Sequence, residues 1–176
     1  REFEITTADD PTNHMEEEIN DLAIESLALL APVASDLRKV IAAIKIASEL
    51  ERIGDYAKNI SKFLIKNDHL TDIVCDYAIS MEKDLIGMLE KAMQCMVDQD
   101  EEAAFAIPES DHRINQQMKD IREKLLSQNG VDKEQLLDEL FEISAMLRNI
   151  ERAGDHVKNI CEHILYMMKG QHYDFG

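Results

Sequence analysis

The sequence predicts an all-α protein, and three observations lead to this fold class. Six glycines and three prolines are few for 176 residues, whereas β-sandwiches and barrels need turn residues about every ten positions. Apolar residues recur at three- and four-residue steps, which is the period of an amphipathic helix. Hydrophobic residues make up 45% of the chain, which is enough to form a core. A protein of long helices therefore fits better than a β fold.

Five helices are predicted, in chain order, for residues 15–30, 34–66, 69–98, 101–128 and 132–169. Pro32 ends the first helix, and Ala34–Asp36 offers an N-cap for the second. Pro108 is expected to kink the fourth helix because proline lacks a backbone N–H. Gly130 ends the fourth helix and Gly170 the fifth. Short connections between five helices are typical of antiparallel bundles.

The charge balance excludes two classes of partner. The chain carries 36 acidic and 19 basic residues, a formal net charge of −17. Nucleic-acid binding and polybasic membrane binding both need clustered Lys and Arg, so neither is expected. We recognise no secretory signal, and the longest apolar run, near Val40–Ala47, is interrupted by Lys45. We therefore expect no transmembrane helix and a cytoplasmic location.

Three cysteines, Cys75, Cys95 and Cys161, have no Cys-x-x-Cys spacing and are odd in number. A disulfide framework and a thiolate zinc site are therefore not expected. Buried free thiols in a reducing compartment are the favoured interpretation.

A ten-residue segment recurs at an offset of 100 residues, with seven of its ten positions identical. Residues 51–60 read Glu-Arg-Ile-Gly-Asp-Tyr-Ala-Lys-Asn-Ile, and residues 151–160 read Glu-Arg-Ala-Gly-Asp-His-Val-Lys-Asn-Ile. Internal repeats mark repeated structural units, so the chain divides into two copies, 1–67 and 68–176. The second copy has three helices and the first only two. The first copy is therefore expected to be incomplete and to lack its opening helix.

The repeated segment places carboxylates on the apolar side of a helix. At about 100° per residue, Glu51, Asp55 and Asn59 share one face with apolar residues that precede them in the helix. These are Leu37, Ile41 and Ile44. Two carboxylates on a core-facing stripe repel each other and lose hydration, so something must compensate for them.

The second copy repeats this arrangement, with Leu137 and Phe141 leading into Glu151 and Asp155. A bound cation is one compensator, and carboxylates with a nearby amide suit Mg²⁺, Mn²⁺, Ca²⁺ or Fe³⁺. The alternative is that the acids form surface ion pairs, which is the favoured interpretation of one isolated Glu-x-x-x-Asp. Recurrence of the pattern in one register favours a metal site in each copy.

Two further pairs of residues support metal sites. Gly54 and Gly154 lie inside helices, where glycine costs about 1 kcal/mol relative to alanine, so each is expected where another group comes close. Asp9 and Asp111 echo each other at an offset of 102 residues. They could complete the two sites from across the bundle, although each alone fits a helix-surface acid.

Other candidate residues have plainer explanations. His112, His156 and His163 lie beside these positions, and each is expected to be an ordinary exposed or hydrogen-bonded histidine. Asp36 is most simply the N-cap or a first-turn acid of its helix. The nine methionines are expected in the core.

Enzymatic interpretations fit poorly. A ferritin-like di-iron site needs two Glu-x-x-His motifs, and the sequence has one, Glu109–His112. The sequence contains no G-x-S-x-G, P-loop or H-E-x-x-H motif. We therefore predict that the protein is not an enzyme.

The residues around both motifs resemble the PhoU family. Ala34–Arg38 followed by Glu49–Asp55 is similar to the first PhoU signature. Asn149–His156 followed by Asn159–Glu162 is similar to the second, and Tyr166–His172 is similar to the PhoU C-terminus. The resemblance spans nearly the whole chain. It implies two tandem three-helix bundles, of which the first lacks its first helix here, each with a metal cluster.

The resemblance also implies a function. Such a protein is a metal-binding negative regulator of the bacterial phosphate response, an adaptor between the phosphate ABC transporter ATPase and the sensor histidine kinase. It would reach the membrane only through these partners. The implied metal is Fe, Zn, Mn or Mg. The implied ligands are Glu51, Asp55, Glu151 and Asp155, with Asp9 and Asp111 matching the opposing acids.

The chain departs from the family pattern in two places. Asn13 and Asn115 stand where the family often has a second acid, which predicts fewer metal ions or a water in place of a ligand. The missing first helix would leave the first bundle open, which makes a homodimer plausible.

Three alternatives remain. A PhoU-like cytoplasmic domain of a sodium/phosphate cotransporter is the first, although the Ala34–Arg38 segment and the ending after Gly170 argue against it. The others are a metal-dependent phosphate-handling enzyme and a plain structural bundle. The duplicated motif is the main evidence against the plain bundle.

Overall fold

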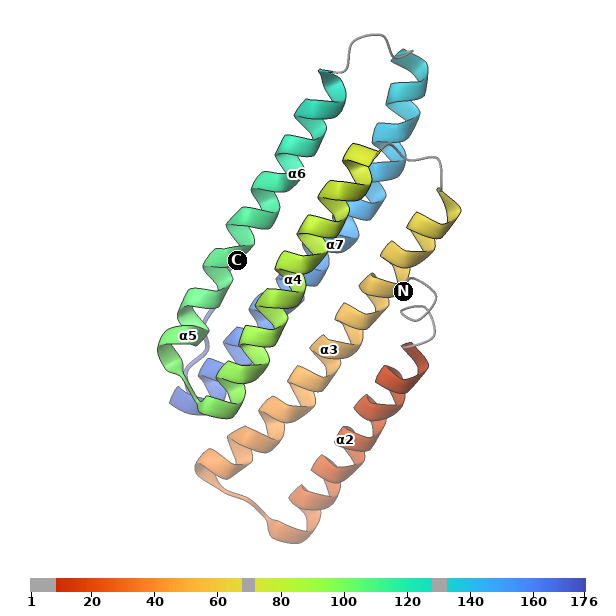
Figure 1. Ribbon diagram of the computed structural model, residues 1–176. Helices are drawn as coiled ribbons and strands as arrows, with labels where there is room; N and C mark the ends of the chain where they lie inside the picture. Colours follow the sequence, from red (N-terminus) through yellow and green to blue (C-terminus); the bar gives the residue numbers. More distant parts are fainter. Residues whose placement is uncertain (1–8, 68–71, 128–132) are drawn as a thin grey trace.

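A computed structural model describes residues 9–67, 72–127 and 133–176, and these residues form helices without any strand (Figure 1). The fold class predicted from the sequence is confirmed. The long helices are α2 (Asp9–Leu30), α3 (Ala34–Lys66), α4 (Asp72–Asp98), α6 (Asp111–Leu126) and α7 (Lys133–Lys169). Two short elements, α5 (Glu101–Ala106) and the 3₁₀ helix η1 (Ile107–Ser110), separate α4 from α6.

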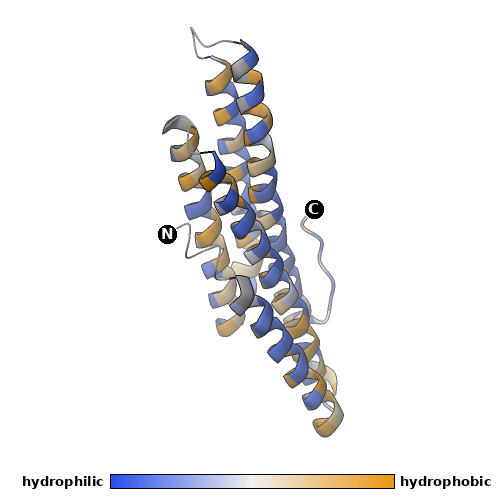
Figure 2. Ribbon diagram, turned by 90° about the vertical axis from the view of Figure 1, so that its right-hand side faces the viewer, coloured by the Kyte–Doolittle hydropathy of each residue, from blue (hydrophilic) through white to orange (hydrophobic). Residues whose placement is uncertain are grey.

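Helices α4, α6 and α7 pack together as a three-helix bundle. The inner side of α4 is a seam of buried residues that recur at alternating intervals of four and three. This is the spacing of helix–helix packing in bundles. The seam residues are Val74, Ala78, Met81, Leu85, Met88, Ala92 and Cys95. Figure 2 shows the matching alternation of hydrophobic and hydrophilic residues along the helices.

The fourth predicted helix is broken at the proline. Asp100 caps α5 by accepting a hydrogen bond from the backbone N–H of Ala103 at 3.0 Å. The α-helix then tightens into η1, with Pro108 in its first positions, before α6 begins at Asp111. Proline cannot donate to the carbonyl one turn earlier, so the break is the expected kink.

The first half of the chain is a helical hairpin of α2 and α3. Helix α3 lies antiparallel to α7 along much of its length, and among the described residues α2 contacts α3 and no other helix. Within the described residues, three long helices follow position 68 and two precede it. Pro32 lies in the connection between α2 and α3.

Several details of the sequence prediction are corrected. Helix α2 begins six residues earlier than expected, at Asp9. The N-cap of α3 is Val33, without a side-chain hydrogen bond, so Asp36 is a first-turn acid and not the cap. Met15 is exposed and not part of the core. Gly170 ends α7 with a φ of +69°, whereas Gly130 lies outside the described residues.

Within the described ranges, no helix is long and apolar enough to cross a membrane. This agrees with the expectation from the interrupted apolar runs.

The three cysteines differ in burial. Cys95 and Cys161 are buried, whereas Cys75 is half-buried, and none forms a disulfide. Burial, together with the nearby Cys95 and Glu162, raises the pKa of the Cys161 thiol to about 12. Burial and the charge of Asp100 also raise the pKa of Cys95.

At pH 8, we expect iodoacetamide to label Cys75 in the native protein much faster than Cys95 or Cys161. A thiol whose pKa lies far above the solution pH contains almost no thiolate, which is the reactive form. Peptide mass spectrometry after timed labelling measures this. Labelling of all three cysteines at equal rates in urea is the control, and equal rates in native buffer would contradict the structure.

Candidate metal centre

The two copies of the repeated segment face each other across the α3–α7 contact. Tyr56 of α3 and His156 of α7, which occupy equivalent positions in the two copies, stack with ring centroids 5.5 Å apart and an interplanar angle of 30°. Equivalent residues that meet across an interface are the mark of two-fold-like packing. The halves are therefore joined at their motifs.

One carboxylate from α3 is held by three side chains of α7. Glu49 accepts hydrogen bonds from His156 Nδ1, from Asn159 Nδ2 at 3.3 Å and from His163 Nε2 at 3.4 Å. Because a carboxylate only accepts, the two imidazole nitrogens are assigned as donors. Burial raises the pKa of Glu49, but the hydrogen bonds from His163, His156 and Asn159 outweigh this and hold it below its usual value.

This Glu49 cluster was not found in the sequence as a unit. His156 and His163 are hydrogen-bonded histidines, as expected, but their partner lies more than a hundred residues away in the chain. The sequence alone does not show how α3 and α7 align side by side. It therefore could not place Glu49 next to His156 and His163. The internal repeat does not point to Glu49, because the equivalent residue in the second copy is Asn149.

In the first copy, acids from two helices converge. Glu51 and Asp55 of α3 lie one turn apart, and Glu16 of α2 approaches them. The Glu51 side chain is only 17% exposed, and Arg52 lies 3.8 Å from it. Burial and the negative charges of Asp55 and Glu16 raise the pKa of Glu51, and Arg52 offsets only part of this effect. The acids around Glu51 therefore have a net repulsive effect on its carboxylate.

Asp9 is the acid that the sequence predicted opposite Glu51 and Asp55. The side chain of Asp9 lies outside the described residues, although its backbone begins α2. The residue that faces Gly54 is Thr12, whose Cγ2 would be 3.5 Å from an added Cβ. Glu16, two turns after Asp9 on the same helix face, is the opposing acid that the structure adds.

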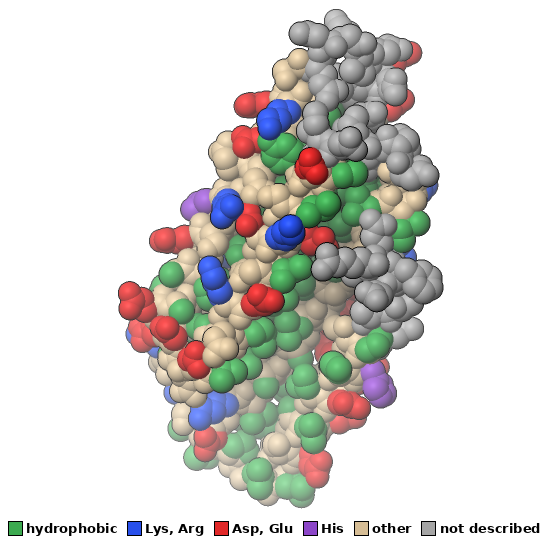
Figure 3. All heavy atoms as spheres, in the orientation of Figure 1, with side chains coloured by type: hydrophobic (Ala, Val, Ile, Leu, Met, Phe, Trp, Pro, Cys, Tyr) green, Lys and Arg blue, Asp and Glu red, His purple; other side chains and the backbone are tan. Residues whose placement is uncertain are grey.

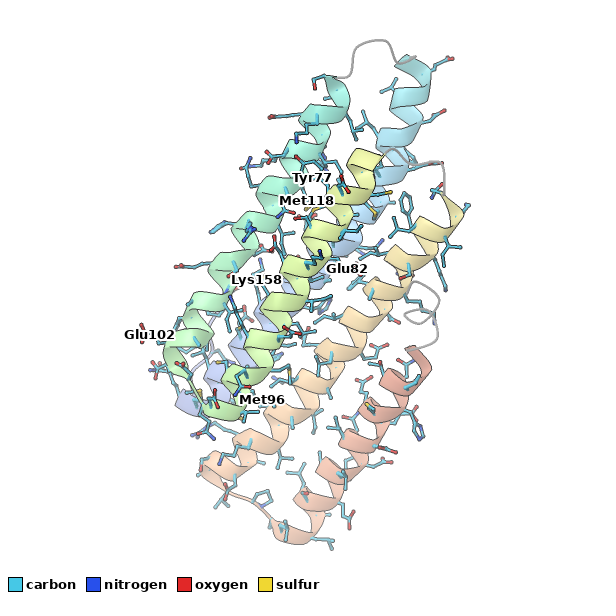
Figure 4. The ribbon with its side chains drawn as sticks, in the orientation of Figure 1. Tyr77, Glu82, Met96, Glu102, Met118 and Lys158 are labelled. Carbon is cyan, nitrogen blue, oxygen red and sulfur yellow. The ribbon has the colours of Figure 1, made fainter. Side chains whose placement is uncertain are left out.

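In the second copy, a lysine occupies the centre of the acids. Lys158 Nζ lies 3.0 Å from Asp155 Oδ1 and 3.5 Å from Asp111 Oδ2, and Figure 4 shows its side chain between α7 and the start of α6. Burial lowers the pKa of Lys158, but the hydrogen bond to Asp155 and the charge of Asp111 outweigh this and raise it. A cation was expected to compensate the carboxylates of this copy, and the Lys158 ammonium group takes that role.

Asp111 is buried and fixed from three sides. Asn115 Nδ2 donates a hydrogen bond to Asp111 Oδ2 at 2.9 Å. On the other side, Asp111 Oδ1 would be only 2.8 Å from a Cβ added to Gly154. The glycine is therefore present because a carboxylate approaches the α7 backbone, which is the close approach predicted for this position.

The second copy differs from the expected core-facing stripe. Leu137, Phe141, Glu151 and Asp155 are all exposed, and Phe141 is 82% exposed. The expectation that Glu151 and Asp155 share a buried stripe is therefore wrong. The buried side of α7 is taken by its contacts with α3, α4 and α6, which leaves this face toward solvent.

A hollow of about 380 Å³ opens beside the second copy. It is lined by Phe105, Pro108, Glu109, Asp111, His112, Lys158 and Phe175. His112 is exposed at its edge, as the sequence suggested. The C-terminal residues turn back along the bundle (Figure 2), and Phe175 N donates to Glu162 Oε1 at 2.9 Å.

The donor sets of the two copies differ in how well they fit a metal ion. As they stand, no three carboxylate, imidazole or thiol groups among the described side chains are close enough to hold one. Glu16, Glu51 and Asp55 are nevertheless oxygen ligands of the type that a hard cation takes, and a cation would relieve their repulsion. Asp111 and Asp155 fit less well, since Lys158 already neutralises them.

The sequence and the fold both match known proteins. The family model of the PhoU domain matches residues 3–64 and 78–164. This chain belongs to the PhoU family. It is 32% identical over 168 residues to the phosphate-specific transport system accessory protein PhoU of Serratia marcescens, a match that covers 95% of this chain and 69% of that protein. It is 31% identical over 172 residues to the PhoU of Escherichia coli strain K12, covering 96% and 70% of the two chains.

Two solved PhoU structures have the same fold. The phosphate transport system regulatory protein PhoU from Streptococcus pneumoniae has a TM-score of 0.83 and 26% identity, covering 98% of this chain and 81% of that chain. PhoU from Pseudomonas aeruginosa has a TM-score of 0.85 and 26% identity, covering 97% and 82%. The PhoU resemblance of the sequence is thereby confirmed.

The two motif glycines give a matched pair of variants. We expect Gly54→Ala to raise the free energy of unfolding by about 0.5–1 kcal/mol, because alanine favours the helix and meets only ordinary contact with Thr12. Gly154→Ala should lose this gain or destabilise the fold, because the new Cβ displaces Asp111 from Lys158 and Asn115. Urea denaturation measures both changes, and equal stabilisation by the two substitutions would contradict the close approach of Asp111.

Proposed function

We propose that this protein is a regulatory adaptor of bacterial phosphate uptake that acts in the cytoplasm without catalytic turnover of its own. In this proposal, it binds the ATPase of a phosphate ABC transporter and the sensor histidine kinase of the phosphate response, and it keeps that response off when phosphate is sufficient. It binds metal between α2 and α3.

One observation carries the proposal. The PhoU match extends through both halves of the chain, and the relatives carry names as accessory proteins of phosphate-specific transport. The metal part is supported separately, by the acids that converge between α2 and α3.

The side chains that would hold the metal are Glu16, Glu51 and Asp55. A divalent cation there would cancel the repulsion that raises the pKa of Glu51 and would join α2 to α3 through shared ligands. Oxygen ligands of this kind suit Mn²⁺, Mg²⁺ or iron. In the second copy, a metal would have to displace Lys158 from Asp111 and Asp155, so binding there is weaker.

The chemistry of the described side chains supports an adaptor over an enzyme. Cys95 and Cys161 are buried with raised thiol pKa values, so neither has the thiolate character of a catalytic nucleophile. The half-buried Glu49 cluster is engaged in joining α3 to α7. Both features are expected of a structural core.

Isothermal titration with MnCl₂ tests the metal site. Glu51→Gln and Asp55→Asn should each weaken Mn²⁺ binding at least tenfold, because each removes a carboxylate ligand. Glu151→Gln is the matched control, since it changes the equivalent but exposed acid of the second copy, and it should leave this binding unchanged. Lys158→Met should add a second binding event by freeing Asp111 and Asp155.

A flat Mn²⁺ titration of the metal-free protein would overturn the metal site. Equal loss of Mn²⁺ binding in Glu51→Gln and Glu151→Gln would also overturn it. Neither result would bear on the adaptor role, which needs its own test.

Affinity capture from phosphate-replete bacterial cells, with this chain as bait, tests the adaptor role. We expect the transporter ATPase and the sensor kinase among the captured proteins, and reduced capture by the Asp55→Ala/Asp155→Ala double variant. Quantitative mass spectrometry measures the recovery, with untagged lysate as the control. Recovery of neither protein would contradict the proposal.

A further inference from the structure

Helices α4 and α6 border a hollow in which positive charge collects. Figure 3 shows lysine and arginine side chains on the face that these two helices form, with acids among them. The hollow has a volume of about 200 Å³, and three cationic residues line it, Lys83, Lys91 and Arg113. Among the described residues of its lining, Asp84 is the one acid. Positive charges therefore exceed negative ones by two, in a chain whose formal net charge is −17. We call this site the α4–α6 hollow.

The two lysines of the hollow have no acidic partner on their own helix. Lys83 and Lys91 lie within about 80° of each other around α4. Side chains three or four positions apart pair on a helix surface, and no Asp or Glu stands at these positions from either lysine. Asp98 and Asp100 line a neighbouring hollow with Lys91. Among the described side chains, however, neither lysine forms an ion pair, so their charge is left for a ligand.

The acid of the hollow is already occupied. Arg113 Nε lies 3.3 Å from Asp84 Oδ2, and Gln117 Nε2 donates a hydrogen bond to the same oxygen at 2.6 Å. Asp84 therefore positions the arginine and does not neutralise the lysines. Because a guanidinium group has five N–H donors, Arg113 keeps donors for a ligand. The hydroxyl of Ser110, which also lines the hollow, makes no capping hydrogen bond and adds another donor.

A glycine between the two lysines gives a second, independent observation. Gly87 lies inside α4, where glycine costs about 1 kcal/mol relative to alanine, and it lines the hollow. The motif glycines are explained by close neighbours, since a Cβ added to Gly54 would meet Thr12 and one added to Gly154 would meet Asp111. A Cβ added to Gly87 would meet no described atom within 4 Å. This glycine therefore leaves open space between the lysines, where a ligand can approach the helix backbone.

We propose that the α4–α6 hollow binds a phosphate group, either as the free ion or attached to a partner molecule. Ammonium, guanidinium and hydroxyl donors match an oxyanion that carries two charges and several acceptor oxygens. None of the described lining residues is aromatic, so the hollow has no surface on which a nucleotide base would stack. The inference stands on the lining side chains and on Gly87. It does not depend on the metal site or on the adaptor role.

An NMR titration of the isotope-labelled full chain with sodium phosphate tests the site. Backbone amide signals of residues 83–91 and 110–113 should shift and reach saturation, whereas sodium chloride at equal ionic strength should not reproduce these shifts. The three cationic side chains are exposed, so binding should weaken as the salt concentration rises. The dissociation constant from the saturation curve is the quantity that the variants change.

Matched variants separate the hollow from the net charge of the chain. Lys83→Gln/Lys91→Gln should raise the dissociation constant for phosphate at least tenfold. Lys62→Gln/Lys119→Gln removes the same charge from two exposed lysines outside the hollow and should leave it nearly unchanged. Gly87→Leu keeps every cation but fills the open space, so it should also weaken binding at least tenfold. This last variant should fold, because leucine favours a helix over glycine and meets no described neighbour.

A second probe distinguishes the two sources of the phosphate group. It is the acetylated and amidated tripeptide Gly-phosphoserine-Gly, with its unphosphorylated form as the control. Tighter binding of the phosphopeptide than of inorganic phosphate would assign the hollow to a phosphorylated partner, and the reverse order would assign it to the free ion.

Three results would overturn the proposal. The first is the absence of saturable shifts with both phosphate and the phosphopeptide. The second is equal weakening of binding by the two double lysine variants. The third is unchanged binding in Gly87→Leu.

Discussion

The antiparallel packing of α3 on α7 is the contact on which the rest of this structure depends. Helix α2 contacts only α3 among the described helices, so the whole first half is attached to the second through this one pair. Its apolar part is the inner side of α3, with Ala42, Ile46, Ile53 and Ile60 buried. Its polar part is Glu49, whose carboxylate is bonded by three side chains of α7. Such a half-buried, charge-assisted group fixes the register, because sliding by one turn would leave the carboxylate without these donors.

This packing also explains why two nearly identical segments have different surroundings. In the first copy, α3 turns Glu51 and Asp55 toward α2, where Glu16 adds a third negative charge. In the second copy, α7 buries its other sides against three helices and leaves Glu151 and Asp155 exposed. Lys158 then compensates Asp111 and Asp155 internally. The motif acids are the same in both copies, but the neighbouring helix differs and brings Glu16 to the first copy and Asp111 to the second.

The sequence predicted the helices well because their signals are local. Apolar spacing, Pro32, Pro108 and Gly170 each act within a few residues, and the structure follows them. The ten-residue repeat also predicted that the chain divides into two copies, which stays a prediction. The close approach at Gly154 was predicted because a glycine inside a helix has a local cost that something else must offset.

The parts that the sequence missed depend on how helices lie against one another. The Glu49 cluster joins residues from two helices whose register no local pattern defines. The contact of Lys158 with Asp111 was missed because Asp111 lies on a different helix. The exposure of Leu137 and Phe141 was missed for a related reason, since an apolar stripe shows which side of a helix can be buried but not whether a neighbour covers it.

The acidic charge of α2 acts on its contact with α3. Glu16 approaches Glu51 of α3 closely enough to raise the pKa of that carboxyl. Among the described helices α2 contacts only α3, so repulsion between Glu16 and the acids of α3 acts directly on the position of α2. A cation shared by Glu16, Glu51 and Asp55 would change that repulsion into attraction and hold α2 against α3. Metal binding would thus favour a hairpin in which α2 lies close against α3.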